Sequence, residues 1–349
     1  MFVGINYPWI DYGWDFGDPP AAWVASKDIS AWREGKRKGI EEDFKTFASQ
    51  GIFAVRWFLL ADGLNYGTGD FAPRKTGNQW MFEPLPADHS FYSGLQDDFE
   101  FVLRVCLQYG LKLFPSLIDF SWCHQGVPMR GNPEIVKGGR YGVVRDAPKR
   151  QAFFDRILDP LLMSSMQYRD SLYAWELINE PEWVIRGSWK TNKNRNVTRE
   201  EMKAFIMEGT RRINAIRLDD GSPAFRSSIG FAHRNSIDKW NAHELGITLH
   251  QFHYYAQKNR ALPSEAHSTG RPCVVGEFAT AVGRDWPDLK EQNREQTVTN
   301  RLACIEQKGY PACFLWSAKS IDAATRWNEE THRAVFACSS LNRRAGIRA

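Results

Sequence analysis

Residues 172–183 read LYAWELINEPEW, and this stretch decides the fold that the sequence predicts. The run 172–178 is short and mostly apolar, which is typical of a buried strand. Pro181 disfavours continuation of regular structure, so we expect the strand to end beside Asn179 and Glu180. A long polar segment, 179–197, then separates it from the next helical pattern. A buried strand that runs into a long loop is typical of parallel α/β proteins, whose loops carry functional groups.

Seven further apolar runs repeat this arrangement along the chain. The complete set of predicted strands is 2–6, 52–57, 112–118, 172–178, 225–230, 247–253, 272–277 and 311–317. Amphipathic segments lie between them and predict helices at about 30–50, 94–110, 149–169, 198–218, 234–243, 258–268, 288–309 and 327–338. Helix-end signals support this pattern, because Thr198 and Glu201 have the spacing of a capping box. Gly51 and Gly110 stand where a helix C-terminus needs a left-handed residue.

Strands and helices that alternate eight times predict an α/β fold, namely a (β/α)8 TIM barrel. A doubly wound sheet also alternates, but it usually carries a glycine-rich phosphate loop after its first strand, where this chain has Tyr7-Pro8-Trp9. Neither a linker nor a repeat is visible, so we expect 1–349 to be a single barrel catalytic domain. Its long loops, 58–92, 119–148 and 179–197, would lie at the C-terminal face.

Composition excludes several classes of protein. Lys and Arg number 45 against 41 Asp and Glu, a formal net charge of +4, which argues for neither nucleic acid nor a membrane surface as partner. The start of the chain lacks the basic and apolar regions of a signal peptide, so we expect a cytoplasmic protein. Fourteen tryptophans, many of them in loops, suggest a surface for flat, hydroxylated or apolar ligands.

The cysteines show no CxxC spacing. We therefore expect reduced, packed thiols rather than disulfides or a zinc site. The six positions are Cys106, Cys123, Cys273, Cys304, Cys313 and Cys338.

Two glutamates end predicted strands on roughly opposite sides of the barrel. Glu180 follows the fourth strand, and Glu277 follows the apolar run of the seventh. A lone solvated glutamate before a proline is common, so Glu180 alone would not indicate chemistry. Two carboxylates that flank one bond are what glycoside hydrolysis requires, and a separation of about 5–5.5 Å implies retention of configuration.

With these residues in place, the chain resembles the clan A glycoside hydrolases, in particular glycoside hydrolase family 5, the cellulase-like family. No single motif is specific, but the ordered set is, and it spans the whole chain. The matching positions are Asn6, Arg56, Asn179-Glu180-Pro181, His253-Tyr254-Tyr255, Gly276-Glu277-Phe278 and Trp316.

The resemblance implies a retaining β-glycoside hydrolase with Glu180 as acid/base and Glu277 as nucleophile. Arg56 and Tyr255 would keep the nucleophile ionised, and the acid should be less well compensated. Asn179 would contact the sugar 2-hydroxyl. The other residues expected to bind substrate are Asn6, Trp9, Asp119, His124, Trp183, His253 and Trp316, the last as an apolar floor.

One departure from the family pattern concerns the third strand. The family usually has Asp-x-His there, whereas this chain has Asp119-Phe120-Ser121, with His124 three residues later. Either His124 turns into the site or the subsite differs. Glu176 lies on the same face as Glu180 and is expected to pair with Arg56 inside the barrel.

Alternative functions stay open. A barrel that binds sugar without cleaving it would be free to lose one of the glutamates, and a transglycosylase would use the same pair. A metal-dependent barrel hydrolase would want His-x-His after the first strand, where only Asn6 stands. We expect no cofactor and no metal, and an oligosaccharide or glycoside as substrate, of glucose or mannose type. Oligomeric state, linkage, and exo or endo action are not indicated.

Overall fold

The computed structural model describes residues 1–10, 14–17, 28–64, 74–76, 79–130, 132–187, 195–255, 262–265, 270–279, 294–319 and 329–344. Within these residues eight parallel strands form one sheet. They are β1 (Phe2–Asn6), β2 (Ala54–Phe58), β5 (Lys112–Asp119), β8 (Trp175–Asn179), β9 (Ser227–Gly230), β10 (His250–Tyr254), β11 (Cys273–Ala279) and β12 (Ala312–Trp316).

The sheet closes into a barrel. Its strand order is β10-β11-β12-β1-β2-β5-β8-β9. The two end strands meet through a parallel bridge between Phe231 and Phe252, where the His253 N–H donates to the Phe231 carbonyl at 2.8 Å. The predicted (β/α)8 fold is therefore confirmed, and each of the eight predicted strands overlaps an observed one.

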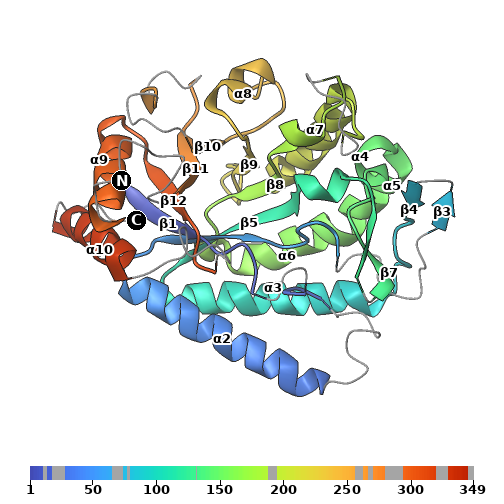
Figure 1. Cartoon of the computed structure of the whole chain (residues 1–349), viewed down its shortest axis with the longest axis horizontal. Coiled ribbons are helices and arrows are strands. Elements are labelled where there is room, and N and C mark those ends of the chain that lie inside the picture. The colour runs from blue at the N-terminus through green and yellow to red at the C-terminus, as the bar shows by residue number, and fades with distance from the viewer. Residues whose placement is uncertain are drawn as a thin grey trace.

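Helices surround the sheet (Figure 1), with α2 and α3 along one side and α7 and α8 on the opposite side. The α-helices are α2 (Ile29–Ser49), α3 (Ser90–Tyr109), α4 (Gly142–Arg145), α5 (Ala147–Phe153), α6 (Asp159–Gln167), α7 (Arg199–Ala215), α8 (Arg234–Lys239), α9 (Arg294–Gln307) and α10 (Glu329–Arg344). A π-helical turn, Phe154–Leu158, joins α5 to α6, and 3-10 turns occupy Phe120–Cys123, Arg169–Ser171 and Pro181–Val184.

Helix-end predictions are confirmed where the structure describes them. Thr198 and Glu201 form a reciprocal capping box at the start of α7. Gly110 has the left-handed backbone, with φ +67°, that ends α3, and Gly51 has φ +82° after α2. The short predicted helix near 258–268 falls largely outside the described residues.

The loops after β2 and β5 carry two hairpins that the sequence did not predict. These are β3–β4 (Arg74–Thr76, Gln79–Met81) and β6–β7 (Val127–Met129, Asn132–Lys137). Most of these strands are three residues long, too short for an alternating pattern to stand out from a loop.

The inside of the barrel is layered. Phe114, Tyr173 and Phe314 pack their rings together at the bottom, with centroids 5.4–5.7 Å apart. Above them lies a polar layer around Arg56. Gly230 and Gly276 make room for that layer, since a Cβ at either position would come within 2.5–2.7 Å of a buried polar side chain. The glycines at the strand ends thus allow charged groups inside the barrel.

Four of the six cysteines, Cys106, Cys123, Cys273 and Cys313, are buried, as expected of packed thiols. Among the described helices none is both long and apolar enough to cross a bilayer.

Candidate active site

Glu180 and Glu277 face each other at the C-terminal end of the barrel. Pairing between β8 and β9 shifts register between Glu176 and Asn179, and pairing between β10 and β11 shifts between Phe252 and His253. Such irregularities re-aim side chains, which allows both Asn179 and Glu180 to face the mouth although they are adjacent. Glu180 itself has a left-handed backbone, with φ +45°. A non-glycine residue in that conformation is strained and is held by its surroundings.

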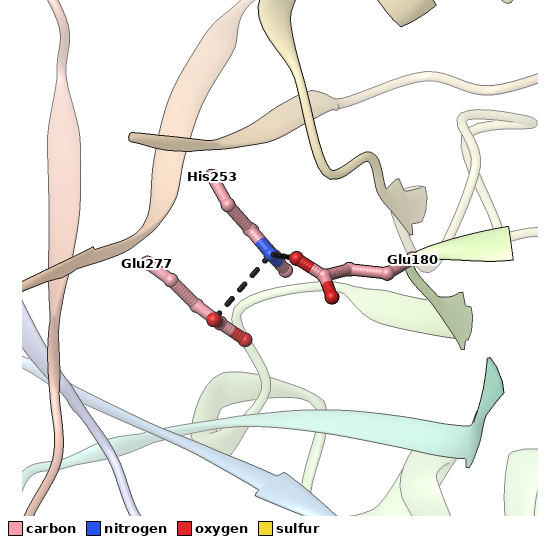
Figure 2. A group of neighbouring side chains, drawn as sticks. All are labelled: Glu180, His253 and Glu277. Atoms are coloured by element: carbon pink, nitrogen blue, oxygen red, sulfur yellow. Dashed lines mark hydrogen bonds and ion pairs between the residues drawn. The ribbon is translucent and has the colours of Figure 1, made fainter. Parts of the chain in front are cut away.

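His253 lies between the two carboxylates (Figure 2). Its Nδ1 is 2.7 Å from Glu180 Oε1 and 3.4 Å from Glu277 Oε2. One ligand atom from each of these three residues lies within 4.8 Å of the others, a grouping that could hold a metal ion. Spacing along the sequence does not reveal this grouping, because His253 and Glu180 are 73 positions apart. One oxygen of Glu180 and one oxygen of Glu277 therefore also lie within 4.8 Å of each other.

Arg56 donates hydrogen bonds to several polar side chains beneath the two glutamates. Its Nε and Nη2 donate to the two oxygens of Glu176, at 2.7 and 2.6 Å. Nη1 donates to Glu277 Oε1 at 2.7 Å, and Nη2 also donates to Asn179 Oδ1 at 2.7 Å. With a further bond to Asn6, all five guanidinium hydrogens are used. The predicted pairing of Glu176 with Arg56 is confirmed.

Asn6 was expected to bind substrate, but it is not among the residues that line the two cavities described below. Its side chain is completely buried. Oδ1 accepts from Arg56 at 2.8 Å, and Nδ2 donates to the Gly276 carbonyl at 3.0 Å. Asn6 lies opposite Arg56 in the pairing of β1 with β2, so it orients Arg56 from within the polar layer.

The charges around the glutamates do not follow the predicted order. Burial alone would raise the pKa of the Glu180 carboxyl, but the hydrogen bond and charge of His253 bring that pKa below its ordinary value. Burial raises the pKa of Glu277, although the charges of His253 and Arg56 oppose it. The cause is geometric, because His253 is nearer to Glu180, and Arg56 divides its charge between Glu277 and Glu176.

The pKa of His253 is also shifted by the two glutamates. Burial would lower the pKa of its imidazole, yet the nearby carboxylates, Glu277 foremost, raise it above its ordinary value. The two Glu180 oxygens each accept a hydrogen bond, one from His253 and one from the Trp183 indole N–H at 2.9 Å. Glu180 and His253 are thus coupled through one hydrogen bond, which favours the ionised carboxylate and the protonated imidazole.

On one side of Glu180 and Glu277 lies a cavity of about 550 Å³, which we term the narrow pocket. Three aromatic rings form one wall, since Trp9, Phe58 and Trp316 have centroids 6.3–6.5 Å apart. Tyr255, whose hydroxyl donates to Glu277 Oε2 at 2.6 Å, lies at its edge. The other lining residues are Ala61, Asp62, Asp119, Phe120, Ser121, His124, Asn179, Glu180 and Glu277.

On the other side lies a larger cavity of about 1250 Å³, which we term the wide cleft. Trp183 is 42% exposed there, and the His233 ring meets it edge to face at 5.9 Å. Arg234 and Asp238 of α8 line the cleft and pair with each other at 3.2 Å. Trp183 is thus a broad, accessible ring beside the Glu180 carboxylate.

His124 shares a pocket with both glutamates, but among the described residues no hydrogen bond joins its ring to either carboxylate. It lines the narrow pocket with its ring 5.2 Å from Phe120, and burial lowers the pKa of its imidazole, opposed by Asp62. His124 thus turns toward the pocket that holds both glutamates, although it does not stand where the family's histidine would. Ser121 and Asp119 occupy the space beside Asn179, with Asn179 Nδ2 donating to Asp119 Oδ2 at 2.8 Å.

The loop tryptophans behave less uniformly than the sequence suggests. Trp122 is completely buried and donates to the Arg140 carbonyl at 3.0 Å, so it belongs to the core. Trp189 and the side chain of Trp80 fall outside the description. Among the described tryptophans, those that line the two cavities are Trp9, Trp183 and Trp316.

Phe58 was missed by the sequence reasoning. It lies two residues after Arg56 on the same strand and so shares its face. Arg56 sits over the Phe58 ring at 5.0 Å, and that ring lines the narrow pocket. The period of two, continued one step past Arg56, would have found it.

No protein-family model matches the chain, and no curated protein matches its sequence. Solved structures do match the fold. The chain is similar to an endo-1,4-β-mannanase from Eisenia fetida, with TM-score 0.64 and 16% identity over 96% of this chain and 90% of that one. It is similar to a β-1,4-mannanase from Aplysia kurodai, with TM-score 0.65 and 17% identity over 97% and 92%.

A third similar structure is a GH5_18 protein from Bifidobacterium longum in complex with Manβ1-4GlcNAc. Its TM-score is 0.59 at 12% identity, over 99% of this chain and 79% of that one. At such identities the likeness establishes the fold alone, a (β/α)8 barrel.

Proposed function

We propose that this protein is a retaining β-glycoside hydrolase that acts on β-linked mannose-type oligosaccharides or glycosides. The observation that carries the proposal is the close approach of Glu180 and Glu277 at the barrel mouth, where one oxygen of each carboxylate lies within 4.8 Å of the other. Inverting enzymes need about 6.5–9.5 Å between their carboxyl groups to admit a water molecule. The mannanases among the structural neighbours support the mannose type.

In the first step Glu277 is the nucleophile. Its Oε2 accepts from Tyr255 and its Oε1 from Arg56, so the carboxylate is held in one orientation before substrate arrives. As a carboxylate oxygen bonds to the sugar C1, the bond from C1 to the leaving oxygen breaks. That oxygen takes a proton from Glu180, which releases the leaving group as an alcohol and leaves a glycosyl ester on Glu277.

Glu180 must receive its proton before this step. The Nδ1 of His253 is 2.7 Å from Glu180 Oε1, so one proton can move along a single hydrogen bond between them. Substrate that fills the mouth excludes water and weakens the solvation of the Glu180 charge, which favours the protonated carboxyl. The hydrogen bond to His253 thus gives Glu180 a direct route by which it can be protonated before the leaving group departs.

In the second step Glu180 acts as base. The ester at Glu277 carries no charge, so a negative neighbour has gone, and this lowers the pKa of Glu180. Glu180 then takes a proton from water, whose oxygen attacks C1 and breaks the ester. Two inversions give net retention.

The two cavities suggest how substrate lies. The narrow pocket, with its aromatic wall and Asn179, suits the sugar that is attacked, since sugar faces pack on aromatic rings. The wide cleft begins at Trp183 and suits the leaving group. Glu180 and Tyr255 line both cavities and mark the scissile bond between them.

The test is to trap the intermediate. We would treat the protein with 2-deoxy-2-fluoro-β-mannosyl fluoride, digest it, and identify the labelled peptide by mass spectrometry. A label on Glu277 is expected, and Glu277→Gln should take up none. A label on another carboxylate, or turnover without any covalent species, would show that the proposed roles are wrong. The corresponding glucosyl fluoride tests which sugar is preferred. If it labels the protein faster than the mannosyl fluoride, the substrate is of glucose type rather than mannose type.

A further inference from the structure

We propose that Asp119 is a positioning residue, which fixes the amide of Asn179 so that one Nδ2 hydrogen points to the substrate. The inference rests on the proposed function, and it assigns to this chain's unusual Asp119-Phe120-Ser121 segment a role in transition-state binding. Asp119 acts through Asn179 and does not need to touch the reacting atoms.

Asn179 is held from both ends. Its Oδ1 accepts from Arg56 Nη2 at 2.7 Å, and its Nδ2 donates to Asp119 Oδ2 at 2.8 Å. The side chain is 5% exposed and lines the narrow pocket beside Glu277. The second Nδ2 hydrogen has no acceptor among the described residues, so it is the group that a ligand can use. A rotated amide would point Nδ2 at a guanidinium, which has only donors.

Asp119 is itself fixed by Ser121. The Ser121 backbone N–H donates to Asp119 Oδ1 at 3.0 Å, and the Ser121 hydroxyl bonds to the same oxygen. Asp119 is the N-cap of the 3-10 turn Phe120–Cys123, so the carboxylate is locked to the backbone. A chain of bonds therefore runs from this turn through Asp119 to Asn179.

Only an ionised carboxylate at position 119 can accept hydrogen bonds from both Ser121 and Asn179. Burial raises the pKa of Asp119 to about 6, and the bonds from Ser121 and Asn179 oppose that rise. At neutral pH both oxygens are therefore acceptors, each facing a donor. An asparagine at 119 would turn its NH2 toward either the Ser121 N–H or the Asn179 NH2, so one donor must face another. Where the NH2 faces Ser121, Asn179 keeps only a neutral acceptor that has lost its bond from the Ser121 N–H; where it faces Asn179, the bond to Asn179 is lost. In either orientation the isosteric change loosens Asn179 without changing volume.

Orientation of Asn179 matters because contacts to the sugar 2-hydroxyl strengthen in the transition state of glycoside hydrolysis. A loss at Asp119 should therefore appear in kcat/KM and depend on that hydroxyl. A direct contact between Asp119 and another hydroxyl would not show this dependence.

The experiment compares Asp119→Asn with the wild type on an aryl β-mannoside and on its 2-deoxy analogue. We expect kcat/KM on the parent to fall on the order of 10- to 100-fold, as for a lost charge-assisted bond, and to change less than about 3-fold on the 2-deoxy substrate. An equal loss on both substrates overturns the proposal. Asp62→Asn is the matched control, because this second carboxylate of the narrow pocket makes no described bond to Asn179, and its effect should be the same on both substrates.

A second measurement needs no turnover. The side-chain amide of Asn179, assigned in a ¹⁵N–¹H spectrum with Asn179→Ala, should have one proton shifted downfield by the Asp119 carboxylate. Asp119→Asn should move that signal upfield, and Asp62→Asn should leave it in place. An Asn179 amide that is indifferent to Asp119 overturns the proposal even if the enzyme is inactive on mannosides. A shifted amide in a protein without glycosidase activity would instead show that the proposed function is wrong.

Discussion

The narrow pocket and the wide cleft are built in different ways. Strand ends of the barrel form the floor of the narrow pocket, and its polar groups bond to one another through Arg56, Asn179 and Asp119. The wide cleft is lined by a short helix, α8, and by Trp183, whose ring is 42% exposed. A buried network restricts what binds, whereas an open aromatic surface tolerates variety. Under the proposed function, this difference predicts strict selection of the sugar that is attacked and loose selection of the leaving group.

The largest effect is expected at the floor of the narrow pocket. Glu277→Gln removes the nucleophile but keeps a hydrogen-bonding side chain, and kcat should fall by about 10⁵-fold or more. The loss should be the same for every leaving group, because the first bond to C1 cannot form. Steady-state rates on several aryl β-mannosides measure this. A loss that varied with the leaving group would contradict the assignment of Glu277 as the nucleophile.

Glu180 stands between the two regions, and its removal should depend on the leaving group. Glu180→Ala should slow hydrolysis of unactivated glycosides by about 10²- to 10⁴-fold, because the leaving oxygen receives no proton. A dinitrophenyl glycoside should still form the glycosyl ester, which then accumulates for want of a base. Azide, which needs no base, should restore turnover.

The stereochemistry of the azide product separates the two glutamates. Glu180→Ala should give a β-glycosyl azide, because azide enters on the face that the leaving group vacated. Glu277→Ala should give an α-glycosyl azide, because azide replaces the nucleophile. Proton spectra of the products measure this, and exchanged or identical products would contradict the roles.

Trp183→Ala tests the wide cleft by itself. Without the ring, KM for a substrate with a sugar leaving group should rise about 10-fold, as for a lost stacking contact. A dinitrophenyl mannoside should be affected much less, because it neither fills the cleft nor needs a strong acid. The ratio of kcat/KM for the two substrates measures the effect, and an equal loss on both would mean that the cleft does not hold the leaving group.

Trp183→Phe should have a smaller effect, seen in pH dependence. The ring remains, but the indole N–H no longer stabilises the ionised Glu180 carboxylate, so the pKa of Glu180 rises. The acid then keeps its proton to higher pH, and the basic limb of the kcat/KM profile should move upward. A downward move, or none, would mean that this bond is absent in the working enzyme.

No effect at all is expected from metal removal. The grouping of Glu180, His253 and Glu277 resembles a ligand set, but in the proposed mechanism its atoms hold a proton and a sugar. Dialysis against a chelator should leave kcat and KM unchanged. Activity that is lost and then restored by a divalent ion would contradict the two-glutamate mechanism.

Much of the fold could be predicted because it depends on local periodicity. Strand 112–118 was expected and β5 covers Lys112–Asp119, since a buried strand reads as a continuous apolar run. The pairing of Glu176 with Arg56 also followed from the period of two along a strand. The hairpin β6–β7 could not be predicted in the same way, because its strands are short and lie within a long loop.

The site was predictable as a set of residue types and much less as an arrangement. Glu180 and Glu277 stand out because an acid at the end of a buried strand requires a partner or solvent. Asn6 looked the same in sequence as the residues at other strand ends, yet its side chain is buried in the polar layer. Trp122 looked the same as Trp183, yet only Trp183 is exposed to a cavity.

The sequence by itself determined the barrel and the two carboxylates that face each other at its mouth. The period of the apolar residues predicts each strand, and the order of the strands along the chain places the ends of the fourth and the seventh on opposite sides of a barrel. Only the tertiary structure decided which groups share a hydrogen bond at the mouth and which amide is fixed. Those properties depend on distances of 2.7 and 2.8 Å between residues 73 and 60 positions apart, His253 with Glu180 and Asn179 with Asp119. Electrostatic energies change steeply over such distances inside a barrel, and no local pattern encodes them.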